Sequence, residues 1–372
     1  MKNKTLQILA NCACAASLLA LGACGSDSSS SSNDTDMGSA LILVFGSDYS
    51  TGELRWCDPD SSTLSEASLS FNQDSKLVAN GQYLFVLERL GADNISLVDV
   101  SLLNEGSAAV TKQLALSSGA NPSDIVVIDE SKAWLSQEGN DTLLQINPST
   151  LKIQKSVSLA KYTVAGNVSP NMVDLVLTGD TLIALLQRLD HYSPTLPGLI
   201  VLFNASTGSV LDTISLLTSN PTAMAMYKGK LLVTTNGAYN ASYGLDADNK
   251  RGIEQVDLTK GSSKLLATGE DFGGGLNGLA LDSENGIAYV PVYIAWGNVP
   301  LKTFNLSTKT VATNEEVSDV EGSVFFDDFS ENLFLGERAT GNENTFVYNG
   351  SFLKSINGEN ALAPYNITVT RW

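Results

Sequence analysis

The chain has 372 residues, of which 43% are hydrophobic and 17% are charged, a composition typical of a folded globular protein and not of a disordered one. Its formal net charge of −18 opposes binding to nucleic-acid phosphates and to anionic lipid headgroups, so we expect no nucleic-acid partner. Helix patterns are nearly absent. Short runs of Val, Ile, Leu, Thr and aromatic residues alternate with Gly, Asn, Asp and Ser, which predicts an all-β chain.

The first residues have the pattern of an export signal. Lys2 and Lys4 form a positively charged start, and an apolar stretch at 6–21 ends in small residues. A membrane-spanning helix needs about 20 apolar residues, and Asn11 interrupts this shorter stretch. We therefore predict a signal peptide over residues 1–23 rather than a spanning helix.

This signal ends in a second motif, Leu21-Gly22-Ala23-Cys24. The motif resembles the lipobox of bacterial lipoproteins, and the resemblance implies that Cys24 carries acyl chains such as palmitate and becomes the mature N-terminus. The membrane is then one partner, reached through the lipid on Cys24. In Gram-negative lipoproteins a residue other than Asp after the cysteine favours the outer membrane, and Gly25 stands there. The implied location is the cell envelope, at the outer membrane, facing either the periplasm or the outside.

Residues 24–39 are rich in Ser and Asp and contain almost nothing apolar. Such a segment cannot bury enough surface to fold, so we predict a flexible tether. The folded domain is expected over residues 40–372.

A short motif recurs along this domain: an apolar strand end, then Asp or Asn, one spacer, and Ser, Thr or Asp. The clearest copy is 203–207, and successive copies lie 41 to 57 residues apart. Periods of about 40 to 50 residues are typical of propeller blades. The Asp or Asn side chain accepts a backbone N–H two residues further on and so closes a tight turn. The seven positions are Asp58, Asp99, Asn147, Asn204, Asp257, Asn305 and Asn349.

Each repeat divides into four predicted strands, which we give from the innermost to the outermost. The second to fourth units are predicted at 74–80, 83–88, 94–100 and 110–116; at 123–128, 133–137, 142–146 and 152–159; and at 173–177, 182–187, 199–203 and 210–216. The fifth to seventh units are predicted at 223–227, 231–235, 253–258 and 264–268; at 278–281, 288–293, 301–306 and 310–313; and at 323–326, 333–336, 346–348 and 352–356.

The two ends of the domain complement each other. The first unit supplies only three strands, at 41–45, 53–57 and 64–71, and one strand at 364–370 is left over at the other end. An open ring would leave two long unpaired edges, so we predict that the last strand completes the first blade. The predicted fold is a seven-bladed β-propeller with four antiparallel strands per blade, closed three plus one; six or eight blades are the structural alternative.

Two repeats carry a family resemblance. Residues 83–88 read Tyr-Leu-Phe-Val-Leu-Glu and are followed at 94–99 by Asn-Ile-Ser-Leu-Val-Asp, and 134–147 contains a looser copy. These repeats resemble the YVTN type found in seven-bladed surface and periplasmic propellers. Some lipoprotein members of that group bind small molecules beside outer-membrane transporters. The resemblance covers about residues 41–372 and implies a fold and a binding role, with an outer-membrane protein or transporter, or a small molecule, as partner; it carries no catalytic residue and no cofactor.

The loops between second and third strands are expected on one face of the ring. Two of them are long, at 188–198 and 236–252, and a third, at 293–298, carries aromatic residues. Long loops on a rigid scaffold are where binding residues tend to lie. Our leading hypothesis is a non-enzymatic ligand- or protein-binding module that uses the rim of blades 4 to 6. The candidate rim residues are Arg188, Asp190, His191, Tyr192, Tyr239, Tyr243, Tyr293 and Trp296.

The alternative is a calcium-dependent hydrolase similar to the lactonase-like propellers, with its site in the central channel. Polar residues near the starts of inner strands offer oxygen ligands, which suit Ca²⁺, although Asn at such points also closes turns. The only histidine, His191, excludes a His-rich zinc site. The candidate metal ligands are Asn121, Asn171, Asn220, Asn277 and Glu321.

Overall fold

The computed structural model describes residues 39–372 apart from 241–243, 247–249, 315–316 and 322. Contacts divide the chain into two units, Met1–Met37 and Gly38–Trp372, and the fold described here belongs to the second. The predicted signal peptide at 1–23 and the predicted lipidation at Cys24 lie outside the described residues. So does the predicted tether, except for its last residue.

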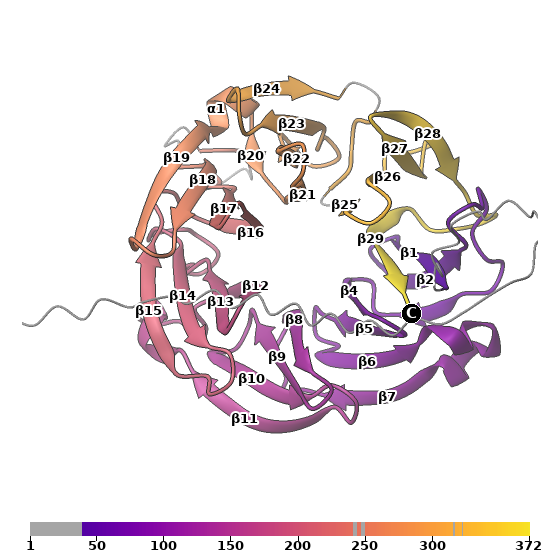
Figure 1. Cartoon of the computed structure of the whole chain (residues 1–372), viewed down its shortest axis with the longest axis horizontal. Coiled ribbons are helices and arrows are strands. Elements are labelled where there is room, and N and C mark those ends of the chain that lie inside the picture. The colour runs from indigo at the N-terminus through magenta and orange to yellow at the C-terminus, as the bar shows by residue number, and fades with distance from the viewer. Residues whose placement is uncertain (1–38, 241–243, 247–249, 315–316, 322) are drawn as a thin grey trace, which may run out of the picture. The chain divides into compact units, whose positions relative to one another are not determined.

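Seven antiparallel β-sheets stand around a common centre, which confirms the seven-bladed β-propeller (Figure 1). From the innermost to the outermost strand, blade 1 is β29 (Pro364–Arg371), β1 (Ala40–Ser47), β2 (Gly52–Cys57) and β3 (Leu69–Phe71). Blade 2 is β4 (Ser75–Asn80), β5 (Tyr83–Glu88), β6 (Asn94–Asp99) and β7 (Val110–Ala115). Blade 3 is β8 (Pro122–Asp129), β9 (Lys132–Gln137), β10 (Thr142–Asn147) and β11 (Lys152–Ser158).

The remaining blades follow the same order. Blade 4 is β12 (Met172–Thr178), β13 (Thr181–Leu186), β14 (Leu199–Asn204) and β15 (Val210–Ser215), and blade 5 is β16 (Pro221–Tyr227), β17 (Lys230–Thr235), β18 (Gly252–Asp257) and β19 (Ser262–Thr268). Blade 6 has an inner strand in two pieces, β20 (Gly275–Leu276) and β21 (Ala280–Asp282), then β22 (Ile287–Tyr293), β23 (Leu301–Asn305) and β24 (Thr310–Thr313). Blade 7 is β25 (Val324–Asp327), β26 (Asn332–Glu337), β27 (Asn344–Asn349) and β28 (Ser351–Ile356).

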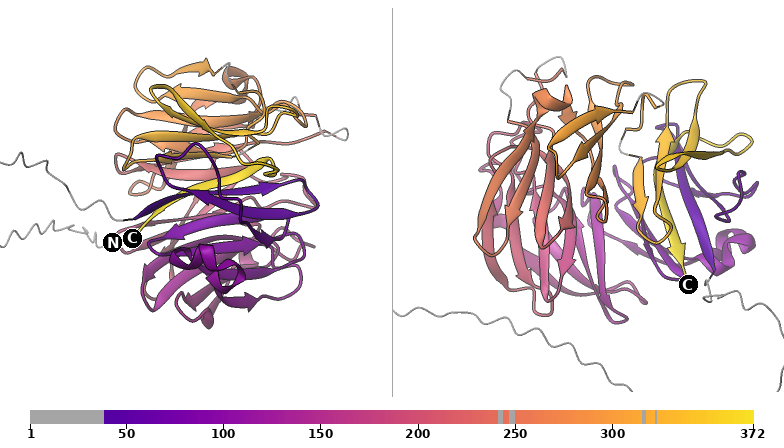
Figure 2. Two further views of the ribbon diagram at one scale, coloured as in Figure 1. Left: turned by 90° about the vertical axis from the view of Figure 1, so that its right-hand side faces the viewer. Right: turned by 45° about the horizontal axis from the view of Figure 1, so that its top comes forward.

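The last strand completes the first blade, as predicted. β29 runs antiparallel to β1, with Leu41 opposite Thr370 and Phe45 opposite Asn366. Figure 2 shows β29, in yellow, beside β1, in indigo. Both edges that an open ring would leave unpaired are therefore hydrogen-bonded to each other.

Apolar side chains pack between adjacent blades because successive residues of a strand point to opposite faces of its sheet. Phe45 of β1 and Val86 of β5 belong to one buried cluster, so blades 1 and 2 share a core. Trp134 of β9 is fully buried between blades 3 and 4, and its indole N–H donates to the carbonyl of Ala205 at 2.7 Å. Burying one large apolar side chain contributes roughly 1.5–3 kcal/mol, so each blade depends on both neighbours.

The alternating strand directions give the ring two faces. The upper face carries the loops between second and third strands and the segments that lead into each inner strand. The lower face carries the other hairpins. Ser39 and Trp372 both lie on the lower face, where the Trp372 N–H donates to the Ser39 carbonyl at 3.0 Å.

In five of the seven predicted turns on the lower face the Asp or Asn side chain accepts a backbone N–H, two residues on as predicted in three of them and three residues on in the other two. At Asn204, for example, the side-chain oxygen accepts from the Thr207 N–H at 2.8 Å. The same bond, two or three residues on, forms at Asp99, Asn147, Asp257 and Asn305. It does not form at Asp58, where the backbone carbonyl of Asp58 accepts the Ser61 N–H instead. It is also absent at Asn349, whose amide donates to Ser330 and Asn332.

Some elements differ from the expected ones. The connection from β6 to β7 forms a 3₁₀ helix, η1 (Val100–Ala109), which begins where the Asp99 carboxylate accepts the Ser101 N–H. A short helix, α1 (Gly269–Phe272), leads into blade 6. The inner strand of that blade is broken after β20, where a Cβ at Gly275 would lie 1.8 Å from Asn236 Oδ1. Among the residues that the structure describes, no helix is long and apolar enough to cross a membrane.

Candidate functional site

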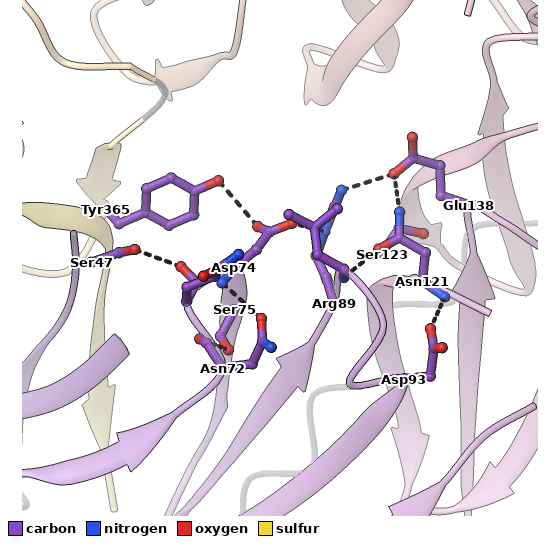
Figure 3. Close-up of polar contacts among 12 residues, drawn as sticks. Ser47, Asn72, Asp74, Ser75, Arg89, Asp93, Asn121, Ser123, Glu138 and Tyr365 are labelled. Atoms are coloured by element: carbon purple, nitrogen blue, oxygen red, sulfur yellow. Dashed lines mark hydrogen bonds and ion pairs between the residues drawn. The ribbon is translucent and has the colours of Figure 1, made fainter. Parts of the chain in front are cut away.

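Close to the ring centre on the upper face, a chain of polar contacts links three blades (Figure 3). Arg89, which follows β5, donates from Nε to Asp74 Oδ2 at 3.1 Å and from Nη2 to Glu138 Oε2 at 2.8 Å. The Tyr365 hydroxyl of β29 donates to the other oxygen of Asp74 at 3.1 Å. Asn121 Nδ2 donates to Glu138 at 2.9 Å. The contacts therefore run from blade 1 through blade 2 to blade 3.

One cation, Arg89, pairs with both carboxylates in this chain of contacts. Burial alone would lower the pKa of Arg89, but Glu138 and Asp74 outweigh it and raise that pKa. Burial, followed by the charge of Asp74, raises the pKa of Tyr365 above its usual 10.0, so the phenol stays a neutral donor. A fully paired network of this kind fixes the positions of its members. We assign it the role of aligning blades 1 to 3.

A second group on the upper face joins blades 6, 7 and 1. Arg338, which follows β26, is buried and forms an ion pair with Glu321 at 2.9 Å. Its guanidinium lies over the rings of Tyr49, at 4.7 Å, and Tyr365, at 5.3 Å. Trp296, from the blade 6 loop, has its ring centroid 5.3 Å from that of Tyr49 and is 74% exposed. We call Tyr49 and Trp296 the aromatic platform.

Acidic groups lie beside this platform. The Tyr49 hydroxyl donates to Glu321. Burial, followed by this hydrogen bond, raises the pKa of Tyr49 to about 12. Burial, then Glu321 and Glu337, raises the pKa of Asp319 to about 6. The platform is therefore a neutral aromatic surface, and the carboxyl of Asp319 is partly protonated near pH 6.

The predicted rim residues do not form one site. Tyr243 lies outside the described residues. Tyr239 and Tyr293 pack edge to face between blades 5 and 6, with ring centroids 5.4 Å apart. Burial raises the pKa of Tyr239 to about 12. Arg188 donates from Nε to the Tyr162 carbonyl at 3.2 Å, so its guanidinium has a structural partner.

The other rim residues of blade 4 lie together. His191 Nδ1 is 2.7 Å from Asp190 Oδ1. The hydrogen bonds from His191 and from Asn167 lower the pKa of Asp190, so this carboxylate is ionised and can only accept. The ring of Tyr192 is 92% exposed. The single predicted rim is thus divided among the blade 4 loop, the Tyr239 pair and the platform.

The blade 4 loop borders a groove of about 350 Å³ between blades 3 and 4. Four upper-face segments build it, two from the approaches to inner strands and two from loops between second and third strands. We call this hollow the upper groove, and its lining includes Asn121, Glu138, Val168, Asn171, His191 and Tyr192.

The candidate metal ligands at the starts of inner strands have other partners. Asn121, Asn171 and Asn220 share a left-handed backbone, with φ of 49°, 55° and 54°. Their carbonyls each accept, at 2.9 Å, the N–H of a residue that follows the second strand of the same blade. Asn adopts this conformation more readily than most residues, so the turn-forming interpretation accounts for all three positions.

The remaining two candidates are also occupied. Asn277 Oδ1 accepts from Asn236 Nδ2 at 3.3 Å, and Glu321 pairs with Arg338 and Tyr49. Within the described ranges, no three His, Cys, Asp or Glu side chains gather as a metal-binding group. The calcium-dependent alternative stays a hypothesis, and the geometry favours none of its candidate ligands.

The inner strands carry an ionic group that the sequence analysis missed. Lys76 of β4 lies 3.1 Å from Asp124 of β8 and 4.0 Å from Asp174 of β12. Each aspartate also accepts a backbone N–H from the next blade, that of Leu175 at 3.0 Å or Met224 at 2.8 Å. Burial raises the pKa of Asp174 to about 8; Lys76 opposes this and Asp124 adds to it. In three successive inner strands a charged residue directly precedes Leu or Ile, and this pattern could have indicated the ionic group.

These features define a seven-bladed β-propeller whose upper face carries a groove and an aromatic platform. No family model matches the sequence, and no curated protein matches it. Solved structures are similar in fold. The hydrazine synthase of Kuenenia stuttgartiensis matches with a TM-score of 0.59 and 14% identity, over 84% of this chain and 96% of that one. AztD from Citrobacter koseri matches with a TM-score of 0.53 and 12% identity, over 90% of this chain and 98% of that one. A functionally unknown protein from Desulfotomaculum acetoxidans matches with a TM-score of 0.58 and 12% identity, over 89% of this chain and 99% of that one. At these identities the likeness concerns the fold alone.

Proposed function

We propose that this chain is a non-catalytic binding protein of the cell envelope, lipid-anchored through Cys24 at the outer membrane, which holds a partner on its upper face. The motif Leu21-Gly22-Ala23-Cys24 behind an apolar segment supports the anchor. The YVTN-like repeats support a surface or periplasmic propeller of the binding kind. The partner is an envelope protein, such as an outer-membrane transporter.

One observation carries the choice of face. Large apolar side chains are exposed on many upper-face segments, where nothing in the fold requires them, and they are Tyr49, Leu90, Val168, Tyr192, Leu217, Ile294 and Trp296. Exposed apolar surface on the loops of a rigid scaffold is typical of binding sites. The lower face also exposes large apolar residues, among them Tyr83, Leu102 and Phe329, but five of its hairpins are closed by Asp and Asn side chains.

The aromatic platform is the centre of the proposed contact. Trp and Tyr are enriched among the residues that dominate binding energy. Trp296 is 74% exposed, and among the described residues its ring packs against that of Tyr49. Truncating it removes the contact surface without opening the core. The half-buried Tyr239 is a poorer probe, since it also packs on Tyr293.

Capture of envelope proteins by the full-length lipoprotein tests this function. The lipoprotein is used as bait on solubilised outer membranes, and retained proteins are quantified by mass spectrometry. Trp296→Ala is expected to lower retention of a specific partner at least tenfold, which corresponds to about 1.4 kcal/mol. Phe329→Ala is the matched control, because Phe329 is 62% exposed on a lower-face hairpin. Equal retention by both variants and the unchanged protein would reject the platform as the docking surface.

A further inference from the structure

We propose that the upper groove between blades 3 and 4 binds a neutral, hydroxyl-rich ligand, namely a sugar unit. This site is separate from the platform and rests on the proposed function only in using the same face. The volume of about 350 Å³ lies near the lower end of the roughly 300–1,000 Å³ typical of small-molecule pockets. The groove is therefore large enough for a small ligand and too small for a folded partner.

The groove has a rigid floor. Gly139, in the blade 3 loop, lies against Gly119, so close that a Cβ at Gly139 would meet the Gly119 carbonyl oxygen at 1.9 Å. Asp93 holds the same segment by accepting from the N–H groups of Gly119 and Asn121, each at 2.7 Å. Pre-formed walls of this kind lower the entropy that a ligand loses on binding.

The two carboxylates beside the groove already accept hydrogen bonds from the protein. Glu138 accepts from Arg89 at 2.8 Å and from Asn121 at 2.9 Å, and Asp190 is bonded to His191 and accepts from Asn167. An anionic ligand would face these carboxylates within a chain of net charge −18. A cationic ligand would have to compete with Arg89 for Glu138 and with His191 for Asp190. The ligand that these walls accept is therefore uncharged.

Several hydrogen-bonding groups in the groove have capacity to spare. Glu138 uses Oε2 for Arg89 and Asn121, which leaves Oε1 as an acceptor. Asn171 accepts the Leu189 N–H through Oδ1 at 3.1 Å, and among the described residues its Nδ2 has no partner. His191 Nδ1 is bonded to Asp190 Oδ1, so Nε2 is the ring nitrogen that remains for a ligand. A free carboxylate acceptor and a free amide donor in one groove match hydroxyl groups, which both donate and accept.

The ring of Tyr192 supplies the apolar part of the site. It is 92% exposed and stands beside Val168, which is 80% exposed. An exposed aromatic ring beside amide and carboxylate groups fits the apolar C–H face of a sugar. Tyr192 and His191 have φ of 72° and 46°, a region that costs a bulky residue of order 1–3 kcal/mol. Backbone strain of this size at an exposed position is typical of ligand-binding loops.

Titration of the full-length lipoprotein with sugars tests the proposal. The probes are neutral mono- and disaccharides, with glucuronate as the anionic and glucosamine as the cationic comparison, and binding is followed by calorimetry and by saturation-transfer NMR. A neutral saccharide is expected to saturate the protein and to bind at least tenfold more tightly than either charged probe. Failure of every neutral saccharide at millimolar concentration, or tighter binding of a charged one, would overturn the assignment.

Two variants localise the binding. Tyr192→Ala removes the exposed ring, and Asn171→Asp keeps the left-handed backbone and the acceptor for Leu189 but replaces the NH₂ donor. Each is expected to weaken saccharide binding at least tenfold at unchanged thermal stability. Tyr83→Ala, an exposed tyrosine on the lower face, should have no effect. Saccharide binding that survives both groove variants would place the ligand elsewhere and reject the groove.

The same measurements separate this proposal from the protein-docking function. Trp296→Ala should leave saccharide affinity unchanged, and Tyr192→Ala should leave protein capture unchanged. Loss of capture in Trp296→Ala without any saccharide binding would reject the sugar site alone. Saccharide binding lost in Tyr192→Ala, with capture indifferent to Trp296→Ala, would support the sugar site and reject the platform.

Discussion

A single residue on an inner strand, Asp174, makes the stability of the fold depend on pH. The group lies where blade 4 meets Lys76 of blade 2, and its Oδ2 accepts the Met224 N–H of blade 5. Burial favours the protonated carboxyl, and the nearby Asp124 adds to this, although Lys76 opposes it. The folded state therefore binds a proton on Asp174 that the unfolded chain releases at lower pH.

The sign of the resulting pH dependence is fixed by this raised pKa. The unfolded value is about 3.9, and the folded value is about 8. The contribution to stability is complete below the unfolded value and is lost as pH rises through the folded one. Asp174→Asn cannot titrate, so its stability relative to the unchanged protein should rise between pH 4 and 8, by at most about 1.4 kcal/mol per pH unit. Urea unfolding at pH 5, 7 and 9 measures this, and a constant difference would show that Asp174 is ionised throughout.

At the scale of the element, the approach to the inner strands of blades 3, 4 and 5 depends on a left-handed residue. Asn220 has φ of 54°, its carbonyl accepts the Asn236 N–H at 2.9 Å, and its Nδ2 donates to the Gly237 carbonyl at 3.0 Å. The residue thus fixes both the turn into β16 and the start of the long blade 5 loop. Related geometry at Asn121 and Asn171 repeats this arrangement in blades 3 and 4.

Substitution at Asn220 separates its two contributions. Asn220→Ala should destabilise the fold by about 2–3 kcal/mol, since the left-handed backbone costs an L-residue roughly 1–2 kcal/mol and the buried hydrogen bond about 1 kcal/mol. Asn220→Gly tolerates the backbone and should lose only about 1 kcal/mol. Thermal and urea unfolding of the pair measures the difference. Equal losses for Ala and Gly would show that the backbone conformation is not the cause.

The strands and their order could be predicted from the sequence because the signals are local. Short runs rich in apolar residues give β5 and β6, and Asp99 or Asn204 marks the end of a third strand. The missed elements depend on distant contacts. The helix η1 exists because Leu103 finds a buried place against the blade 1 and blade 2 core. No pattern within residues 100–109 predicts such a contact.

The candidate sites were predictable to a smaller extent. The loop at 188–198 was expected to bind, and His191 and Tyr192 do line the upper groove. The partners across the groove, such as Gly119 and Glu138, come from blade 3 and could not be paired with it from sequence spacing. Likewise, Trp296 of blade 6 contacts Tyr49 of blade 1, although blade 7 stands between these two blades in the ring (Figure 1). Contacts between side chains of non-neighbouring repeats form only once the ring has closed, so the sequence of each repeat does not predict them.

At the scale of the whole molecule, one strand decides whether the ring exists. β29 supplies the innermost strand of blade 1, and its Asn366 side chain accepts the Leu77 N–H of blade 2 at 2.9 Å. Its removal would expose an edge of β1 and uncover the cores that blade 1 shares with both neighbours. The total stability of a domain is only about 5–15 kcal/mol.

Deleting residues 364–372 should therefore abolish cooperative unfolding and leave an aggregation-prone chain. Removing Trp372 alone should cost little, because that residue contributes a single backbone bond to Ser39. Circular dichroism and analytical ultracentrifugation of both truncations check the expectation. A monomeric, cooperatively folding chain without 364–372 would mean that the first blade is stable with three strands.

The hydrogen bond between Trp372 and Ser39 has a consequence for orientation. It holds Ser39, where the described chain begins, on the lower face, opposite the groove and the platform. Under the proposed lipid anchor, the domain is joined to its tether at a point remote from both candidate sites, so attachment does not occupy them. Moving the attachment point to an upper loop should reduce partner capture while leaving the fold intact.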